Sequence, residues 1–299
     1  MTDAYRTPDQ RFEDLPGYPF EPHYQEFEGL RLHYVDEGRV AGGGDPVLLL
    51  HGEPSWSYLY RKMIPILAER SRVIAPDYFG FGRSDKPIAR EFYTYDRHVR
   101  SVADLAERLD LSGITLVVQD WGGPIGLRFA VEHPERTARL VVLNTGLFSI
   151  SDRWPTPEFM AWRSFAERTG LELPVGFIIQ GATMTDLPPE ILAAYEAPWP
   201  VPESKMGVAT FPLLVPIAES DPGVTEMLAT REALGRWDKP ALVYFSDSDP
   251  IFPPGAAKAM SKLIPTAGEP EFVPGASHFL QEDKGEEIAR RIVRFLEET

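Results

Sequence analysis

Gln119-Asp120-Trp121-Gly122-Gly123 is the stretch of sequence that decides the fold. It follows an apolar run, residues 114–118, with the composition of a buried strand, and it precedes residues 124–130, which have the pattern of a helix. A single residue held between a strand and a helix and followed by glycines is typical of a nucleophile elbow. The residue at the turn is an aspartate instead of a serine, so we expect the chemistry of a carboxylate.

Strand and helix patterns alternate on both sides of this turn, which predicts a mostly parallel sheet with helices on both faces. The predicted strands are 24–27 and 32–35 (an antiparallel hairpin), 47–50, 72–75, 114–118, 140–143, 241–245 and 271–273. The predicted helices are 57–70, which Pro65 should kink or split, 95–109, 124–130, 256–263 and 286–297.

The alternation is interrupted by a stretch that is rich in proline and poor in strands. Residues 148–234 carry only short helical patterns, at 157–167 and 188–195. We therefore predict a core formed by residues 1–147 and 235–299, with residues 148–234 inserted as a helical cap. Ligands bind at the carboxyl edge of such sheets, and long insertions there commonly cover an active site.

Composition excludes several classes of protein. The chain of 299 residues has a formal net charge of −15, which would repel nucleic acid. It contains no cysteine, so disulfides, thiolate catalysis and cysteine-bound metals are excluded. No apolar run approaches the roughly 18 residues of a membrane span. The first twenty residues lack the pattern of a signal peptide, so we predict a cytoplasmic location.

Three residues with complementary chemistry stand in the order nucleophile, acid, base: Asp120, Asp249 and His278. This is the chain order of the α/β-hydrolase fold, and each residue follows an apolar strand, so all three could meet at one rim of the sheet. Asp247 is a rival for the acid, two residues from Asp249. Taken alone, each of the three could be an ordinary turn, cap or loop residue. Their joint order along the chain favours a catalytic triad.

Segments 51–61, 77–87 and 117–123 resemble haloalkane dehalogenases, and the similarity extends from about residue 6 to the last helix. It is closest to the subfamily with glutamate after His-Gly and valine-glutamine before the nucleophile. The resemblance implies an α/β-hydrolase fold and hydrolysis of a small halogenated aliphatic substrate to alcohol, halide and a proton. It implies no cofactor and no metal.

The resemblance also implies roles for the triad. Asp120 displaces the halide and forms an alkyl ester, which water can cleave, whereas serine would leave a stable ether. His278 is the general base for that water, and Asp249 orients it. Some relatives carry the acid after the preceding strand, but that position here is Asn144, which cannot ionise.

Backbone N–H groups of Glu53 and Trp121 are the expected oxyanion donors, and the indoles of Trp121 and Trp162 the expected halide donors, with Trp154 as a rival to Trp162. We expect the Glu53 carboxylate to turn away, since its charge would repel a halide. The resemblance also implies that the pocket walls include Phe159, Phe211, Val215, Ile251 and Phe252.

Two other functions are compatible with this fold. An epoxide hydrolase would share the aspartate, but it protonates the leaving oxygen, usually with two tyrosines from the lid. Tyr195 is the only tyrosine in residues 148–234, which argues against that activity. A non-catalytic ligand-binding relative is the second alternative, and the intact triad argues against it.

Overall fold

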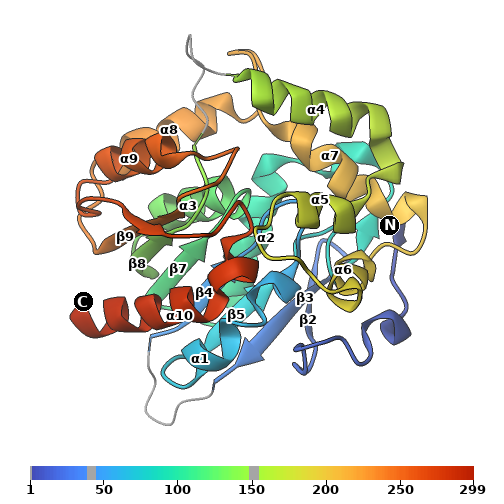
Figure 1. The fold of residues 1–299 in the computed structure, drawn as a ribbon, viewed down its shortest axis with the longest axis horizontal. Helices are drawn as coiled ribbons and strands as arrows, with labels where there is room; N and C mark the ends of the chain where they lie inside the picture. The colour runs from blue at the N-terminus through green and yellow to red at the C-terminus, as the bar shows by residue number, and fades with distance from the viewer. Residues whose placement is uncertain (1, 39–44, 148–154) are drawn as a thin grey trace.

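The computed structural model describes residues 2–38, 45–147 and 155–299, and it contains a mixed sheet of eight strands (Figure 1). The strand order is β10-β9-β8-β7-β4-β5-β3-β2. Neighbours from β10 to β5 are parallel, and β3 is antiparallel to both β5 and β2. The strands are β2 His23–Phe27, β3 Leu30–Glu37, β4 Val47–Leu50, β5 Val73–Pro76, β7 Ile114–Val118, β8 Thr137–Val142, β9 Ala241–Ser246 and β10 Glu271–Val273, and β1 Ala4–Tyr5 pairs with β6 Lys86–Pro87 in a separate sheet.

The predicted mostly parallel sheet and its amino-terminal hairpin are confirmed. The helices are α1 Ile64–Ala68, α2 Tyr95–Arg108, α3 Gly122–Glu132, α4 Pro157–Thr169, α5 Val175–Gly181, α6 Pro189–Glu196, α7 Met206–Leu214, α8 Val224–Leu234, α9 Pro254–Leu263 and α10 Leu280–Glu298. Short 3₁₀ helices span Asp9–Phe12, Ser57–Tyr60, Arg90–Phe92, Gly170–Glu172 and Pro202–Lys205. The predicted helix at 57–70 is split as expected, because Pro65 lies in the first turn of α1.

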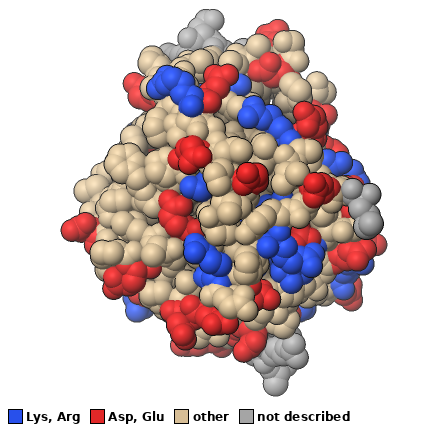
Figure 2. Space-filling view, turned by 90° about the vertical axis from the view of Figure 1, so that its right-hand side faces the viewer, with Lys and Arg blue, Asp and Glu red and all other residues tan. Residues whose placement is uncertain are grey.

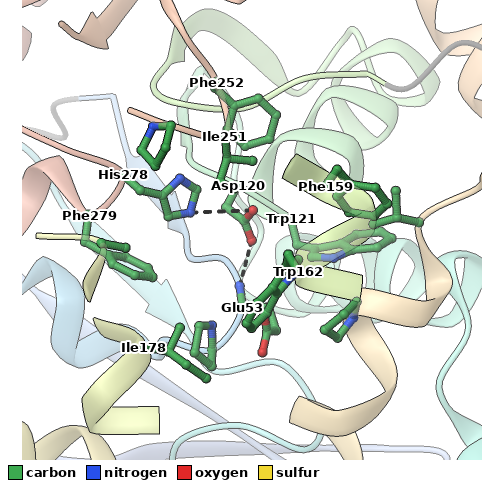
Figure 3. A pocket seen from close by; sticks show the side chains of 15 residues that line it. Glu53, Asp120, Trp121, Phe159, Trp162, Ile178, Ile251, Phe252, His278 and Phe279 are labelled. Atoms are coloured by element: carbon green, nitrogen blue, oxygen red, sulfur yellow. Dashed lines mark hydrogen bonds and ion pairs between the residues drawn. The ribbon is translucent and has the colours of Figure 1, made fainter. Parts of the chain in front are cut away.

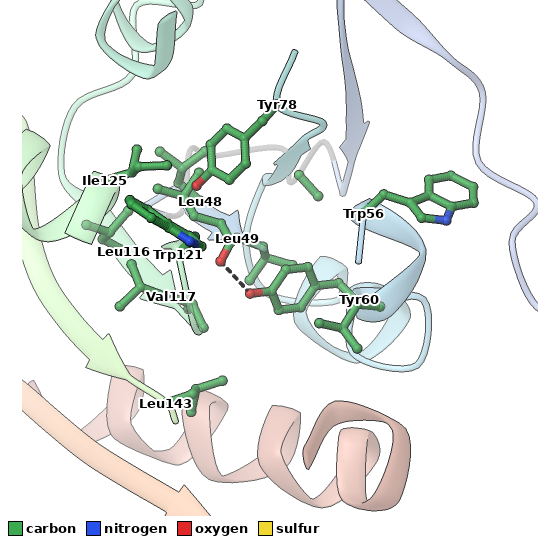
Figure 4. Close-up of a cluster of buried hydrophobic side chains, with 14 of the residues drawn as sticks. Leu48, Leu49, Trp56, Tyr60, Tyr78, Leu116, Val117, Trp121, Ile125 and Leu143 are labelled. Carbon is green, nitrogen blue, oxygen red and sulfur yellow. Dashed lines mark hydrogen bonds between the residues drawn. The ribbon is translucent and has the colours of Figure 1, made fainter. Parts of the chain in front are cut away.

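The central strands β4 and β7 are buried along their whole length, which explains why their sequences are continuous apolar runs. Leu48, Leu116 and Val117 pack in the cluster shown in Figure 4, next to the indole of Trp121. Each such side chain contributes about 1.5–3 kcal/mol on burial. In the same cluster the Tyr60 hydroxyl donates to the carbonyl oxygen of Leu50 (2.8 Å), at the end of β4. The end of β4, which is the parallel neighbour of the strand β7 that precedes Asp120, is therefore held in the buried core.

Helices α4 to α7 lie together to one side of the sheet, at the upper right of Figure 1. Helix α4 packs against α7, and α5 against α6, whereas α8 packs against α3. The sequence predicted that residues 148–234 form the cap; residues 148–154, where that segment begins, lie outside the described residues. The division into core and cap stays a prediction.

Helices α5, α7 and α8 were not recognised in the sequence, which is crowded with prolines on either side of them. Helix α7 even contains Pro212, which cannot donate a backbone hydrogen bond. The guanidinium of Arg163 donates to the carbonyls of Pro212 and Val215 (3.0 Å each) at the end of that helix. Such contacts satisfy the last carbonyls of a helix and favour a cation there.

The surface carries charges of both signs. Figure 2 shows acidic and basic side chains interspersed over one face of the molecule. Within the described ranges, no helix combines the length and the apolar character that crossing a bilayer requires.

Candidate active site

Asp120 occupies the sharp turn between β7 and α3. Its φ is 49°, in the left-handed region that residues other than glycine rarely adopt. The turn is held by two hydrogen bonds, from the Asp120 N–H to the Asn144 carbonyl (2.8 Å) and from the Thr145 hydroxyl to the Asp120 carbonyl (2.6 Å). A side chain at Gly122 would collide with the Leu50 carbonyl, so the glycine permits the close approach. This is the geometry that the sequence motif predicts.

The structure brings together Asp120, His278 and Asp249 (Figure 3 shows the first two). Nδ1 of His278 lies 2.9 Å from Oδ2 of Asp249, and Nε2 lies 3.8 Å from Oδ2 of Asp120. Asp249 follows β9 and also accepts the N–H groups of Ile251 (2.7 Å) and Phe252 (3.0 Å). The imidazole is thus held on one side by a buried carboxylate and faces the nucleophile with the other.

Burial and charge shift the three pKa values in different ways. Burial raises the pKa of Asp120, and His278 with two backbone N–H groups offsets only part of that effect. Burial also opposes ionisation of Asp249, but His278 and the backbone donors outweigh it, so its pKa lies below the usual range. Burial alone would lower the pKa of His278; the charge and hydrogen bond of Asp249, with Asp120, raise it above the usual value.

The rival acid, Asp247, does not contact His278 in the described structure. Its Oδ1 accepts the Gly275 N–H (3.1 Å) and the Ser248 hydroxyl (2.9 Å). Asn144 lies beneath the histidine loop, where its amide nitrogen donates to the carbonyls of Ser277 (2.9 Å) and His278 (3.2 Å). The geometry therefore favours Asp249 as the acid.

Two backbone donors converge on the Asp120 carboxylate. The Glu53 N–H donates to Oδ1 at 2.8 Å, and the Trp121 N–H also bonds the carboxylate. Both come from the ends of parallel neighbours, because Glu53 follows β4 and Trp121 follows β7. These are the two oxyanion donors that the sequence predicts, and their role stays a proposal.

The Glu53 side chain is buried and lines the same cavity as Asp120. Its Oε1 has no hydrogen-bond partner among the described residues, and no cation of the described structure pairs with it. Burial, together with the charge of Asp120, raises the pKa of Glu53 well above its usual value. We expected this side chain to repel a halide because we took its carboxylate to be ionised. The raised pKa favours the neutral acid, which would not repel a halide in this way.

The cavity next to Asp120 has a volume of about 140 Å³ and a mostly apolar wall (Figure 3). Four of the five predicted wall residues line it: Phe159, Val215, Ile251 and Phe252. The placement of Phe211 is corrected, because its ring packs against Trp121 at 5.3 Å and lies behind the wall. The remaining wall residues, which the sequence did not indicate, are Pro54, Ile178, Ala182, Pro212, Pro250 and Phe279.

Trp121 and Trp162 both line this cavity, Trp121 from the elbow and Trp162 from α4. The other described tryptophans, Trp56, Trp199 and Trp237, do not line it, and Trp199 donates its indole N–H to the Gly80 carbonyl (2.9 Å). Trp154, the rival to Trp162, lies outside the described residues. The indole side chains of Trp121 and Trp162 therefore lie at one apolar cavity.

Tyr195 is directed away from this site. Its hydroxyl donates to the buried Glu282 carboxylate (2.5 Å), which also pairs with Arg61. The cavity wall contains no tyrosine among the described residues, so the structure offers no phenolic proton donor for an epoxide oxygen. Within the same described residues, no group of three or more histidine or acidic side chains is arranged to hold a metal ion.

The strand order, the strained aspartate turn and the histidine–acid pair together define an enzyme of the α/β-hydrolase class with a carboxylate at the nucleophile position. A family model described as "alpha/beta hydrolase fold" matches residues 45–177. Haloalkane dehalogenase from Mycobacterium marinum is 48% identical over 298 residues, which cover 97% of this chain and 99% of that protein. Haloalkane dehalogenase 1 from Mycobacterium tuberculosis is 49% identical over 301 residues, covering 99% and 100%.

Among solved structures, the haloalkane dehalogenase from Paraglaciecola agarilytica superposes with a TM-score of 0.91 at 37% identity and covers 97% of each chain. With relatives this similar over nearly the full length, the chain belongs to the haloalkane dehalogenase family, hydrolases that act on carbon–halide bonds. The family assignment does not favour an epoxide hydrolase or a non-catalytic relative.

Proposed function

We propose that the protein hydrolyses a short haloalkane through a covalent ester on Asp120. The carboxylate attacks the saturated carbon, the carbon–halogen bond breaks with its electron pair on the halide, and an alkyl ester remains. Water then attacks the ester carbonyl, His278 takes the proton, and alcohol leaves. One observation carries the proposal: Asp120 lines an apolar cavity with its Oδ2 3.8 Å from Nε2 of His278.

Hydrolysis of the ester develops negative charge on an oxygen of Asp120. The N–H groups of Glu53 and Trp121 already contact this carboxylate, so they are aligned before the charge develops. Removal of one such donor typically raises the barrier by about 3 kcal/mol. Asp249 stabilises the imidazolium that forms on His278.

The departing halide needs donors that do not themselves attack the substrate. An indole N–H group donates a hydrogen bond and cannot accept one. Trp121 lines the cavity from the elbow, and Trp162 lines it from α4. The raised pKa of Glu53 disfavours a second negative charge beside Asp120. We infer that the two indoles bind the halide product.

Cavity size limits the substrate. An apolar cavity of about 150 Å³ accommodates benzene, and the present cavity measures about 140 Å³. We infer that a haloalkane with a short chain is the preferred substrate class. The absence of a nucleic-acid partner and the cytoplasmic location stay predictions of the sequence.

The histidine variant His278→Phe tests the two-step scheme. It should release about one halide per enzyme from a short bromoalkane and then stop, because the ester forms but no base activates the water. Rapid-quench halide measurement gives the burst, and mass spectrometry of the digested protein gives the alkylated peptide.

The control is Asp120→Ala, which should release no halide, while the unmodified enzyme turns over repeatedly. Continued turnover in His278→Phe, or an alkyl group on a residue other than Asp120, would contradict the proposal.

A further inference from the structure

Gln119 precedes the nucleophile and is fully buried, and the scheme above gives its side chain no task. Its Nε2 lies 3.3 Å from Nε2 of His278 and 3.3 Å from the His278 carbonyl oxygen. Its Oε1 has no hydrogen-bond partner among the described residues. The side chain thus touches the ring nitrogen that has to accept a proton from water.

The orientation of this amide is set by the histidine backbone. A carbonyl oxygen can only accept, so the NH₂ group of Gln119 faces the carbonyl of His278. Asn144 donates to the same carbonyl from another side, at 3.2 Å. A flipped Gln119 would place Oε1 against that oxygen, so the second N–H of the amide faces Nε2 of the imidazole.

This contact selects one protonation state of the base. A donor that faces Nε2 requires a lone pair there, which leaves the ring proton on Nδ1, where Asp249 accepts it at 2.9 Å. That tautomer is the one a general base needs. When Nε2 takes a proton from water, the contact with Gln119 becomes donor against donor and is lost.

Gln119 favours the neutral imidazole, whereas the charged groups around the ring favour its protonated form. The carboxylates of Asp249 and Asp120 face its two nitrogens and favour the imidazolium. The aromatic neighbours Phe252 and Phe279 carry no charge. Of the other carboxyls near the loop, Glu53 shares the cavity, and Asp283 on α10 accepts the Ser277 N–H (2.9 Å).

We propose that Gln119 is a positioning residue for the base, whose amide keeps Nε2 of His278 unprotonated and thereby sets the lower pH limit of ester hydrolysis. The inference rests on the proposed function, because it concerns the second half-reaction. It also accounts for the glutamine that the sequence motif places directly before Asp120.

The test is the pH dependence of ester hydrolysis in single turnover with a short bromoalkane, for Gln119→Leu and Gln119→Glu. Loss of one net hydrogen bond should move the acid midpoint of Gln119→Leu upward by about 0.4 to 1 pH unit. Hydrolysis well below the midpoint should then slow by about three- to tenfold, while halide release in the first step changes less than about twofold. Gln119→Glu should move the midpoint further, because a carboxylate favours the imidazolium.

Gln281→Leu is the matched control, because it removes another fully buried carboxamide, one that has no hydrogen bond to His278 within the described structure. Its midpoint should equal that of the unmodified enzyme. A purely structural role of Gln119 would lower the rates at every pH and leave the midpoint in place, and that result would overturn the proposal.

A second measurement needs no Gln119 variant. In the unmodified protein labelled with ¹⁵N-histidine, the His278 signals, assigned by comparison with His278→Phe, should show a proton on Nδ1 and a bare Nε2 above the acid midpoint. A neutral ring protonated on Nε2 would refute the inference. If the protein released no halide at all, the proposed function would fail. The tautomer of His278 would still test whether Gln119 donates to its Nε2.

Discussion

At the scale of single residues, the site contains two neighbouring carboxyls with different surroundings. Asp120 and Glu53 line one cavity, and burial raises both pKa values. Asp120 has compensating partners, namely His278 and two backbone N–H groups, whereas Oε1 of Glu53 has none among the described residues. These surroundings favour the charged form of Asp120 more than that of Glu53.

Glu53→Gln should stabilise the protein increasingly as pH rises. The pKa of Glu53 is raised in the folded protein, whereas in the unfolded chain it has its usual value of 4.5. At pH values between these two pKa values, the folded state therefore binds more protons than the unfolded state. Across that window the free energy of unfolding falls by up to about 1.4 kcal/mol per pH unit, and glutamine lacks this loss. Urea unfolding at pH 5 and pH 8 measures the difference between variant and unmodified protein.

The exposed Glu69 at the end of α1 supplies the control. The effect of Glu53→Gln is compared at each pH with that of Glu69→Gln, which makes the same chemical change at an exposed position. A constant difference for Glu53→Gln would mean that Glu53 is ionised in the folded protein.

At the scale of elements, helix α4 brings two side chains to the cavity. The helix begins after Thr156, whose hydroxyl oxygen accepts the Phe159 N–H (3.2 Å). This cap satisfies one of the four unpaired donors at a helix start. Phe159 and Trp162 lie three residues apart, so they share one face of the helix, and both line the cavity.

Trp162→Phe should weaken bromide binding by about 10- to 100-fold, because a hydrogen bond to a charged group contributes about 1.5–3 kcal/mol. Bromide quenching of tryptophan fluorescence measures the affinity. Trp237→Phe removes a buried indole that does not line the cavity, and its affinity should be unchanged. Equal affinities in both variants would remove Trp162 from the halide site.

At the scale of the whole molecule, one buried cluster joins α6 to α10 and to Arg61, which follows the 3₁₀ helix Ser57–Tyr60. Glu282 of α10 is 1% exposed and pairs with the Arg61 guanidinium. Tyr195 of α6 donates its hydroxyl to the same carboxylate at 2.5 Å. Burial opposes ionisation of Glu282, but Arg61 outweighs it and holds the pKa of that carboxyl below its usual range.

Tyr195→Phe should lower the free energy of unfolding by about 1.5–3 kcal/mol, because it removes a hydrogen bond to a buried charged group. Urea unfolding followed by circular dichroism measures the change. Tyr24→Phe is the control, since the Tyr24 hydroxyl is buried with no hydrogen-bond partner within the described ranges, and its loss should be nearly neutral. Equal losses in the two variants would mean that the cluster contributes no more than an ordinary buried phenol.

The sequence predicted much of the fold and the reactive groups because those features are local. Apolar runs of four or five residues indicated the buried strands β4, β7 and β9, and glycines after Asp120 indicated the elbow. Helix α5 escaped detection because it has only seven residues, and α7 because Pro212 lies inside it. Helix α10 begins at Leu280 rather than 286, and a non-helical Lys284 breaks its periodicity.

Contacts between distant segments were decided only by the tertiary structure. His278 meets Asp249 rather than Asp247, and Gln119 meets His278 across 159 positions. Phe211 packs against Trp121 instead of lining the cavity, and burial raises the pKa of Glu53. A local pattern states which backbone form a segment adopts and which face is apolar. Which side chains then meet, and how far water is excluded from a carboxyl, depends on how separate segments pack.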